Sequence, residues 1–172
     1  MGVLGGLVFS TKSLFPCLRE LTILSCPELI KKLPTYLPSL TSFKKLTVYK
    51  CNETVLRSGI ELTSLTDLTV FGILELIKLQ QGFVRSSGGL QALNFSKCKE
   101  LTCLWEDGFE SESLHCHQLV SLGCNLRSLQ INKCDKLERL PNGWKSLTGL
   151  EMLFIINCPK LVSFPEVGFP GK

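Results

Sequence analysis

Histidine is scarce in this 172-residue sequence, and the two that occur, His115 and His117, flank a single cysteine, Cys116. Zinc sites use pairs of ligands separated by several residues, and the side chains of adjacent residues point apart. The same argument disfavours a thiol and a general base acting together here. No other acid–base pair or nucleophile stands out, so the sequence predicts neither a metal site nor an enzyme.

Long apolar runs and dense basic runs are also missing. No stretch approaches the roughly 20 apolar residues that span a bilayer, and the apolar residues 1–9 lack the basic start and cleavage site of a signal peptide. The net charge of +4 comes from scattered Lys and Arg, which disfavours nucleic-acid binding. We therefore expect a soluble, cytoplasmic protein with no membrane span.

A repeated line fills most of the chain. It reads Leu, two residues, Leu, one residue, an apolar β-former, two residues, and usually Cys. Aligned on their first position, the units begin at Leu18, Phe43, Leu65, Leu90, Leu126 and Leu150. Most spacings are about 22 to 25 residues, within the range of leucine-rich repeats. One spacing is longer and predicts an insertion at about 106–124. We expect residues 1–13 to be an incomplete repeat or linker, and residues 14–172 to form the repeat domain.

Each unit predicts one short strand followed by an irregular or 3₁₀ return. Apolar residues alternate with polar ones, as at Leu129 and Ile131, and this period of two indicates a strand. No unit buries its apolar face alone, so stacking is required. The predicted inner ladder is Leu21, Ile23, Cys26; Leu46, Val48, Cys51; Leu68, Val70, Ile73; Leu93, Phe95, Cys98; Leu129, Ile131, Cys134; and Leu153, Ile155, Cys158. The predicted fold is an α/β solenoid of about six leucine-rich repeats, a horseshoe with a parallel sheet on its concave face. In unit two, the apolar residues after Cys51 fall out of step.

The strand residues between the ladder positions are the candidate binding residues. They are Thr22, Leu24, Thr47, Tyr49, Thr69, Phe71, Asn94, Ser96, Gln130, Asn132, Phe154 and Ile156. Several are apolar, which fits a protein-binding patch; the alternative is that neighbouring modules cover some of them, or that they need no explanation. A basic rim runs beside the strands, at Lys44, Lys45, Lys50, Lys97, Arg127 and Lys133. It fits either an acidic partner or a solvated edge.

Cysteine and tryptophan have structural interpretations. Five of the nine cysteines share one repeat position, where a small buried side chain is needed. The odd total fits poorly with full pairing, so we expect free thiols and a reducing compartment. Trp105 and Trp144 follow strands and are expected to pack over the back-side turns, with a partner hot spot as the alternative.

Three phrases carry a family resemblance: Leu24–Leu29, Asn132–Leu137 and Asn157–Leu161, each with Cys before a Leu. They resemble the repeats of plant coiled-coil nucleotide-binding leucine-rich-repeat disease-resistance proteins. The resemblance implies an intracellular immune receptor that senses pathogen effectors or modified host proteins, or restrains its own nucleotide-binding module. Separately, both ends lack the polar caps that repeat arrays need, so we expect a segment of a longer chain or a truncated relative of one.

The sequence itself has no phosphate-binding loop, because Gly168–Lys172 lacks the spacing and the hydroxyl residue. We therefore expect no ATP or ADP cofactor for this chain. The alternative function is the substrate-recognition repeat of an F-box ubiquitin-ligase adaptor. An extracellular receptor is a third interpretation, although the glycosylation sequons at Asn52 and Asn94 are read as chance matches.

Overall fold

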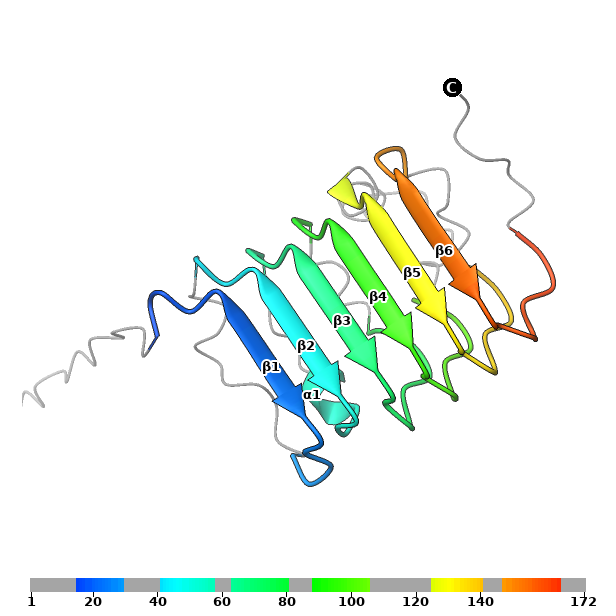
Figure 1. Ribbon diagram of the computed structural model, residues 1–172, viewed down its shortest axis with the longest axis horizontal. Coiled ribbons are helices and arrows are strands. Elements are labelled where there is room, and N and C mark those ends of the chain that lie inside the picture. Colours follow the sequence, from blue (N-terminus) through cyan, green and yellow to red (C-terminus); the bar gives the residue numbers. More distant parts are fainter. Residues whose placement is uncertain are drawn as a thin grey trace, which may run out of the picture.

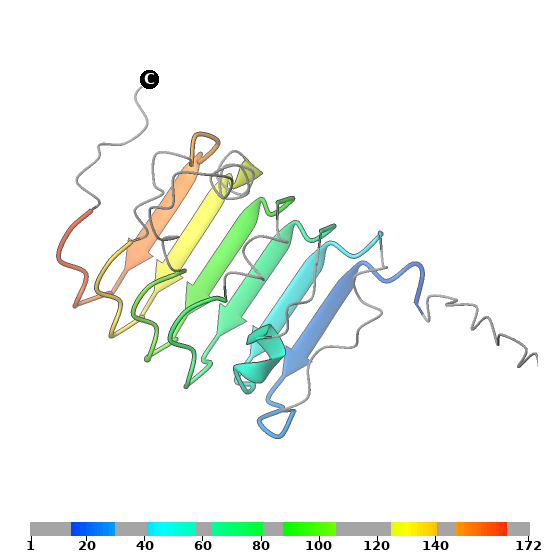
Figure 2. The same cartoon turned by 180° about the vertical axis from the view of Figure 1, so that it is seen from behind.

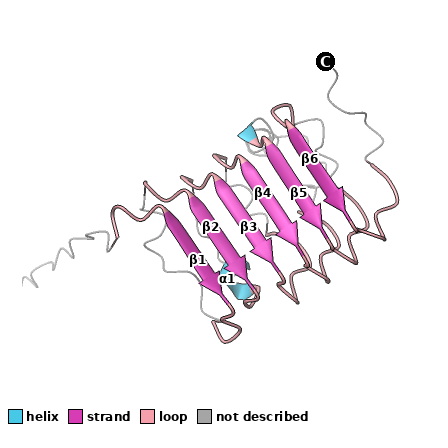
Figure 3. Ribbon diagram, viewed as in Figure 1, coloured by secondary structure: helices cyan, strands magenta, loops and turns pink. Residues whose placement is uncertain are grey.

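Six short parallel strands form one sheet, in the order of the sequence (Figure 1). The computed structural model describes residues 15–29, 41–57, 63–80, 88–105, 125–140 and 147–164. The strands are β1 (Glu20–Leu24), β2 (Lys45–Tyr49), β3 (Asp67–Phe71), β4 (Ala92–Ser96), β5 (Ser128–Asn132) and β6 (Met152–Ile156). All the strands point in the same direction, side by side (Figure 3). This arrangement confirms the predicted leucine-rich-repeat solenoid.

The register joins equivalent positions of successive units. Leu46 pairs with Leu68, Leu68 with Leu93, and Leu93 with Leu129. Each strand begins two residues after the first position of its unit, so the alternation read from the sequence sets which side chains point inward. A slip of one residue would turn the apolar side chains of a strand to the opposite face of the sheet. The apolar pattern therefore specifies the register strongly.

The core lies between the sheet and the return segments, which lie in front of the strands in Figure 2, where the sheet is seen from behind. The inner ladder is fully buried in β2 to β5: Val48, Val70, Phe95 and Ile131 are all 0% exposed. Burial is weaker in β1 and β6 because these strands form the two edges of the sheet. Their ladder leucines and isoleucines are only partly buried.

The cysteines show the same gradient. Cys51, Cys98 and Cys134 are buried as predicted, but Cys158 is half-buried and Cys26 is exposed. The expectation of a buried thiol is therefore wrong for Cys26. Its unit lies at the edge strand β1, which has a neighbouring unit on one side only in the described structure.

The return begins with a tight turn after the cysteine. The backbone N–H of Leu101 donates to the Cys98 carbonyl at 3.2 Å, and Leu137 donates to Cys134 in the same way. The chain then runs extended, with isolated parallel bridges from Leu79 to Trp105 and from Arg139 to Ser163. No 3₁₀ segment occurs in the described ranges, so the return is of the irregular kind.

Unit two differs from the others. A one-turn helix, α1 (Thr54–Arg57), follows Cys51 and lies on the return side of β1 and β2, in front of them in Figure 2. The Asn52 side chain accepts a hydrogen bond from the Thr54 N–H at 3.0 Å and so caps the helix. Val55 and Leu56 are each 1% exposed. Their out-of-step spacing in the sequence is therefore a helical spacing that still reaches the core.

Trp105 is 5% exposed and belongs to the core of the return side, in agreement with its predicted packing role. Trp144, the leader 1–13 and the insertion 106–124 lie outside the described residues.

Candidate protein-binding face

The outward-pointing residues of the six strands form three parallel rows, which together we call the exposed sheet face. The rows contain the first, third and fifth residues of each strand, brought side by side by the register. The sequence analysis proposed the third and fifth positions, and the structure places all twelve of those residues on this face. Whether they bind a protein stays a prediction.

The middle row is polar over most of its length. It contains Thr22, Thr47, Thr69, Asn94, Gln130 and Phe154 in register order. Hydroxyl and amide groups can both donate and accept hydrogen bonds. The row ends at Phe154, whose exposed fraction is 46%. This row therefore offers hydrogen bonds along β1 to β5 and an apolar contact on β6.

The last row is apolar at both ends. Leu24 is 56% exposed and Ile156 is 48% exposed, on the two edge strands. Between them, the rings of Tyr49 and Phe71 stack with centroids 4.4 Å apart and an interplanar angle of 11°. Of these residue types, tyrosine is enriched in protein-binding hot spots, so the Tyr49–Phe71 pair is the strongest candidate anchor in this row.

Ser96 departs from the expectation of an exposed contact, because only 9% of its surface is accessible. It lies between Phe71 and Asn132 in the same row, and both neighbours are larger. Its carbonyl accepts the Gly72 N–H at 2.8 Å. Ser96 therefore contributes little contact surface.

The first row was missed by the sequence analysis. It contains Glu20, Lys45, Asp67, Ala92, Ser128 and Met152. Extending the period-two pattern one step toward the N-terminal end of each strand would have found it. Met152 is 48% exposed and enlarges the apolar end of the face on β6. Glu20 and Lys45 form an ion pair of 3.3 Å, but both side chains are more than half exposed, so the pair adds little stability.

The predicted basic rim splits into two groups, which lie at opposite ends of the strands. Lys44, Lys45 and Arg127 lie at or just before the strand starts, whereas Lys50, Lys97 and Lys133 each follow the last residue of a strand. The two groups are separated by the length of the five-residue strands, so they form two separate basic rims.

Left-handed backbone marks the strand-end group. The φ angles of Lys50, Lys97 and Lys133 are 48°, 54° and 54°, and each backbone N–H donates to the last carbonyl of the next strand at 2.8 to 2.9 Å. The left-handed residue is thus part of how each unit is joined to the next.

The buried thiols hold backbone groups rather than ligands. Cys51 Sγ donates to the carbonyls of Tyr49 at 3.3 Å and of Ile23 at 3.5 Å, which links two units. A thiol–thiol hydrogen bond lowers the pKa of Cys98 and raises that of Cys134. Burial raises the pKa of Cys158. All seven cysteines in the described ranges are free.

The described residues form neither a metal-binding group nor a membrane-spanning helix. In the six ranges that the structure describes, no group of three or more His, Cys, Asp or Glu is placed to hold a metal ion. In the same ranges, no helix has the length and apolar character to cross a bilayer. The His115–Cys116–His117 cluster lies outside them.

Comparison with known proteins gives two findings. Residues 6–159 match the sequence family described as plant disease resistance protein RPS2-like, leucine-rich repeats. A protein of Arabidopsis thaliana, described as a disease resistance RPP13-like protein 1, is 35% identical over 130 residues. That alignment covers 74% of this chain and 11% of the relative, so the chain spans a small part of the relative's length. The F-box alternative gains no support from either comparison.

Proposed function

Because the chain belongs to the leucine-rich-repeat family of plant disease resistance proteins, we propose that its exposed sheet face recognises a protein during the defence response. Repeats of this family are typically non-catalytic recognition modules, and leucine-rich repeats in general mediate protein interactions. The proposal adds that the exposed sheet face is the contact surface, and that this chain binds without a cofactor and without catalysing a reaction.

One observation carries the proposal: the units are alike inside and different outside. The ladder leucines repeat in all six strands, whereas the last row of the exposed face changes from Leu24 to Tyr49, Phe71, Ser96, Asn132 and Ile156. Stacking needs only the repeated residues. The variable residues are free to match a partner, and a rigid sheet presents them with little loss of entropy on binding.

The partner that we propose is a pathogen effector, or a host protein that an effector has modified. A nucleotide-binding module of the same receptor is an intramolecular alternative for the same face. We propose the cytoplasm as the location, where the free thiols of the described residues would stay reduced.

Photo-crosslinking in pathogen-challenged leaf tissue tests the proposal. A photo-reactive phenylalanine analogue replaces Tyr49, Gln130 or Phe154 on the exposed face, and Ile77 or Val162 as controls. The two controls are exposed apolar residues of the return segments, at 52% and 86%. We expect one protein to be captured from the face positions and competed away by unlabelled chain. Equal capture at the control positions would contradict the proposal.

A further inference from the structure

Lysine occupies the left-handed position at the end of three strands. All six units adopt positive φ there, at Ser25, Lys50, Gly72, Lys97, Lys133 and Asn157. Gly and Asn tolerate this backbone most readily, whereas a long side chain with a Cβ is disfavoured. Residues kept in sparsely populated backbone regions are enriched at functional sites. The lysines at these positions therefore call for an explanation beyond the joining of units.

Two of these lysines lie over the aromatic pair of the exposed sheet face. Lys50 Nζ is 5.4 Å from the centroid of the Tyr49 ring, and Lys97 Nζ is 5.0 Å from that of Phe71. Each distance is within the range of a cation–π contact. Since the two rings are themselves stacked, both ammonium groups are held on one rigid aromatic support.

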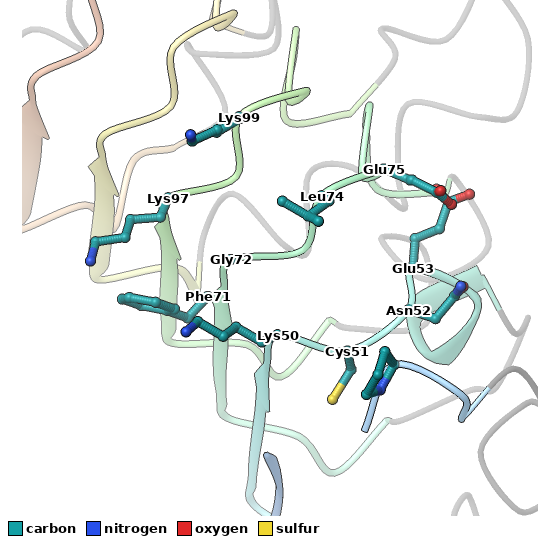
Figure 4. A pocket seen from close by; sticks show the side chains of 11 residues that line it. Lys50, Cys51, Asn52, Glu53, Phe71, Gly72, Leu74, Glu75, Lys97 and Lys99 are labelled. Carbon is teal, nitrogen blue, oxygen red and sulfur yellow. The ribbon is translucent and has the colours of Figure 1, made fainter. Parts of the chain in front are cut away.

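Both lysines line a groove of about 400 Å³ (Figure 4). Gly72 lies between Lys50 and Lys97 in the row of strand ends, and a Cβ at this position would approach Lys50 Cγ to 3.3 Å. Phe71 and Leu74 give the groove an apolar wall, and Leu74 is 66% exposed. The lack of a side chain at Gly72 lets the Lys50 stem lie close to the backbone, and the groove beside Phe71 and Leu74 leaves space for a side chain from elsewhere.

The charge of this groove is polarised. Lys50, Lys97 and Lys99 line the side toward the sheet, and Glu75 and Glu53 line the opposite side in Figure 4. A second groove, of about 700 Å³, shares Lys97 and Lys99 and adds Lys133 beside one carboxylate, Asp135, so lysines continue to line the strand ends toward β6. The two grooves make one basic strip along the strand ends.

Three cations outside the strip form ion pairs with carboxylates in the described residues. Lys45 pairs with Glu20 at 3.3 Å, Lys136 with Glu100 at 2.6 Å, and Arg127 with Glu151. In the part of the chain that the structure describes, Lys50, Lys97 and Lys133 form no ion pair. An acidic occupant would supply the missing charge and leave the cation–π support in place.

We propose that the strip binds an extended acidic segment of the protein partner, with one carboxylate at Lys50, one at Lys97 and an apolar side chain between them over Gly72. This inference rests on the proposed function and specifies the chemical character of the partner segment. Lys50 and Lys97 are two strand spacings apart, about 10 Å. In an extended chain alternate side chains share one face and each residue advances about 3.3 Å, so the three contacting residues occupy alternate positions and the two acidic residues are four positions apart, about 13 Å. The flexible side chains of lysine and glutamate span the difference of about 3 Å.

Fluorescence anisotropy with short labelled peptides tests the proposal. The first peptide carries two Glu residues four positions apart with Leu midway between them. The second has Gln in place of Glu, and the third has the same composition as the first with the two Glu residues adjacent. A single-stranded oligonucleotide of equal charge serves as the polyanion probe. We expect the first peptide to bind, and its affinity to fall at roughly 1 M salt, where the Debye length is about 3 Å.

Charge reversal locates the binding. In the double variant K50E/K97E we expect about tenfold weaker binding, since one exposed ion pair contributes at most about fivefold. The matched control is K44E/R139E, which makes the same charge change at two exposed positions outside the strip. Lys44 precedes the start of β2, and Arg139 lies in a return segment. It should change the affinity by less than about twofold. Gly72→Asn changes no charge and tolerates positive φ, and it should weaken binding by narrowing the groove and displacing the Lys50 side chain.

Three results would overturn the inference: no preference for the first peptide, equal losses in both charge variants, or oligonucleotide binding with the same dependence on Lys50 and Lys97. Thermal unfolding of each variant by circular dichroism establishes that it is folded. The two experiments distinguish failure of this inference from failure of the proposed function. Capture of a partner by the exposed face with no peptide binding removes only this inference, and peptide binding with no capture removes the proposed function.

Discussion

Replacing Leu129 with alanine should destabilise the array far more than the same replacement at Leu153. Both leucines hold the same ladder position, and they are neighbours in register on β5 and β6. Leu129 is 0% exposed and lies between Leu93 and Leu153. Leu153 is only partly buried, because β6 is an edge strand with β5 as its single partner.

The size of the difference follows from burial. Truncating a fully enclosed leucine to alanine removes its transfer free energy and leaves a cavity, which together cost about 2–5 kcal/mol. A partly buried leucine loses less apolar contact, and water can fill the space, so we expect about half that cost. Leu129→Ala should therefore lower the free energy of unfolding by about 3 kcal/mol, and Leu153→Ala by about 1.5 kcal/mol.

Urea unfolding, followed by circular dichroism and tryptophan fluorescence, gives both values. A shift of the midpoint at constant slope reports stability alone, whereas a changed slope would show that the array unfolds in parts. Equal losses at the two positions would refute the reasoning, because they would mean that position along the stack does not set the depth of burial.

Three further predictions concern the stacked rings and the thiols. In a double-mutant cycle of Tyr49→Ala and Phe71→Ala, unfolding should show a coupling of about 0.5–1.5 kcal/mol, and additive effects would contradict the stack. Mapped alkylation should modify the exposed Cys26 readily and the buried Cys98 only after unfolding; comparable rates would argue against the predicted core. Burial raises the pKa of Cys158 above its ordinary 9.0, so its contribution to stability is present below pH 9 and lost as the pH rises further. Unfolding free energies measured across that range should fall less steeply in Cys158→Ala, and identical slopes would contradict this.

The strands and the inner ladder follow from the sequence because both depend on short-range alternation. Every ladder residue from Leu46 to Ile131 lies in a strand or just after it, and the central ones are buried as predicted. The helix α1 was missed because its four residues are shorter than the window in which a helical period is recognisable. Asn52 gave a local signal, since Asn is a favoured helix cap.

Only part of the candidate site could be predicted from the sequence. The twelve outward residues were identified by alternation, but the contacts among them depend on register. Tyr49 and Phe71 belong to different units and stack because β2 and β3 pair in register. Likewise, Lys50 and Lys97 flank one groove because Gly72 lies between them in the row of strand ends.

By itself, the amino-acid sequence determined the repeat, the direction of each side chain and the family, because all three are carried by residue type at fixed spacing. Tertiary structure alone decided which units are buried and which lie at an edge, and which lysines acquire a carboxylate partner. The physical reason is that burial and pairing depend on what lies across the stack. The neighbours in space are residues more than twenty positions away, such as Leu93 and Leu129.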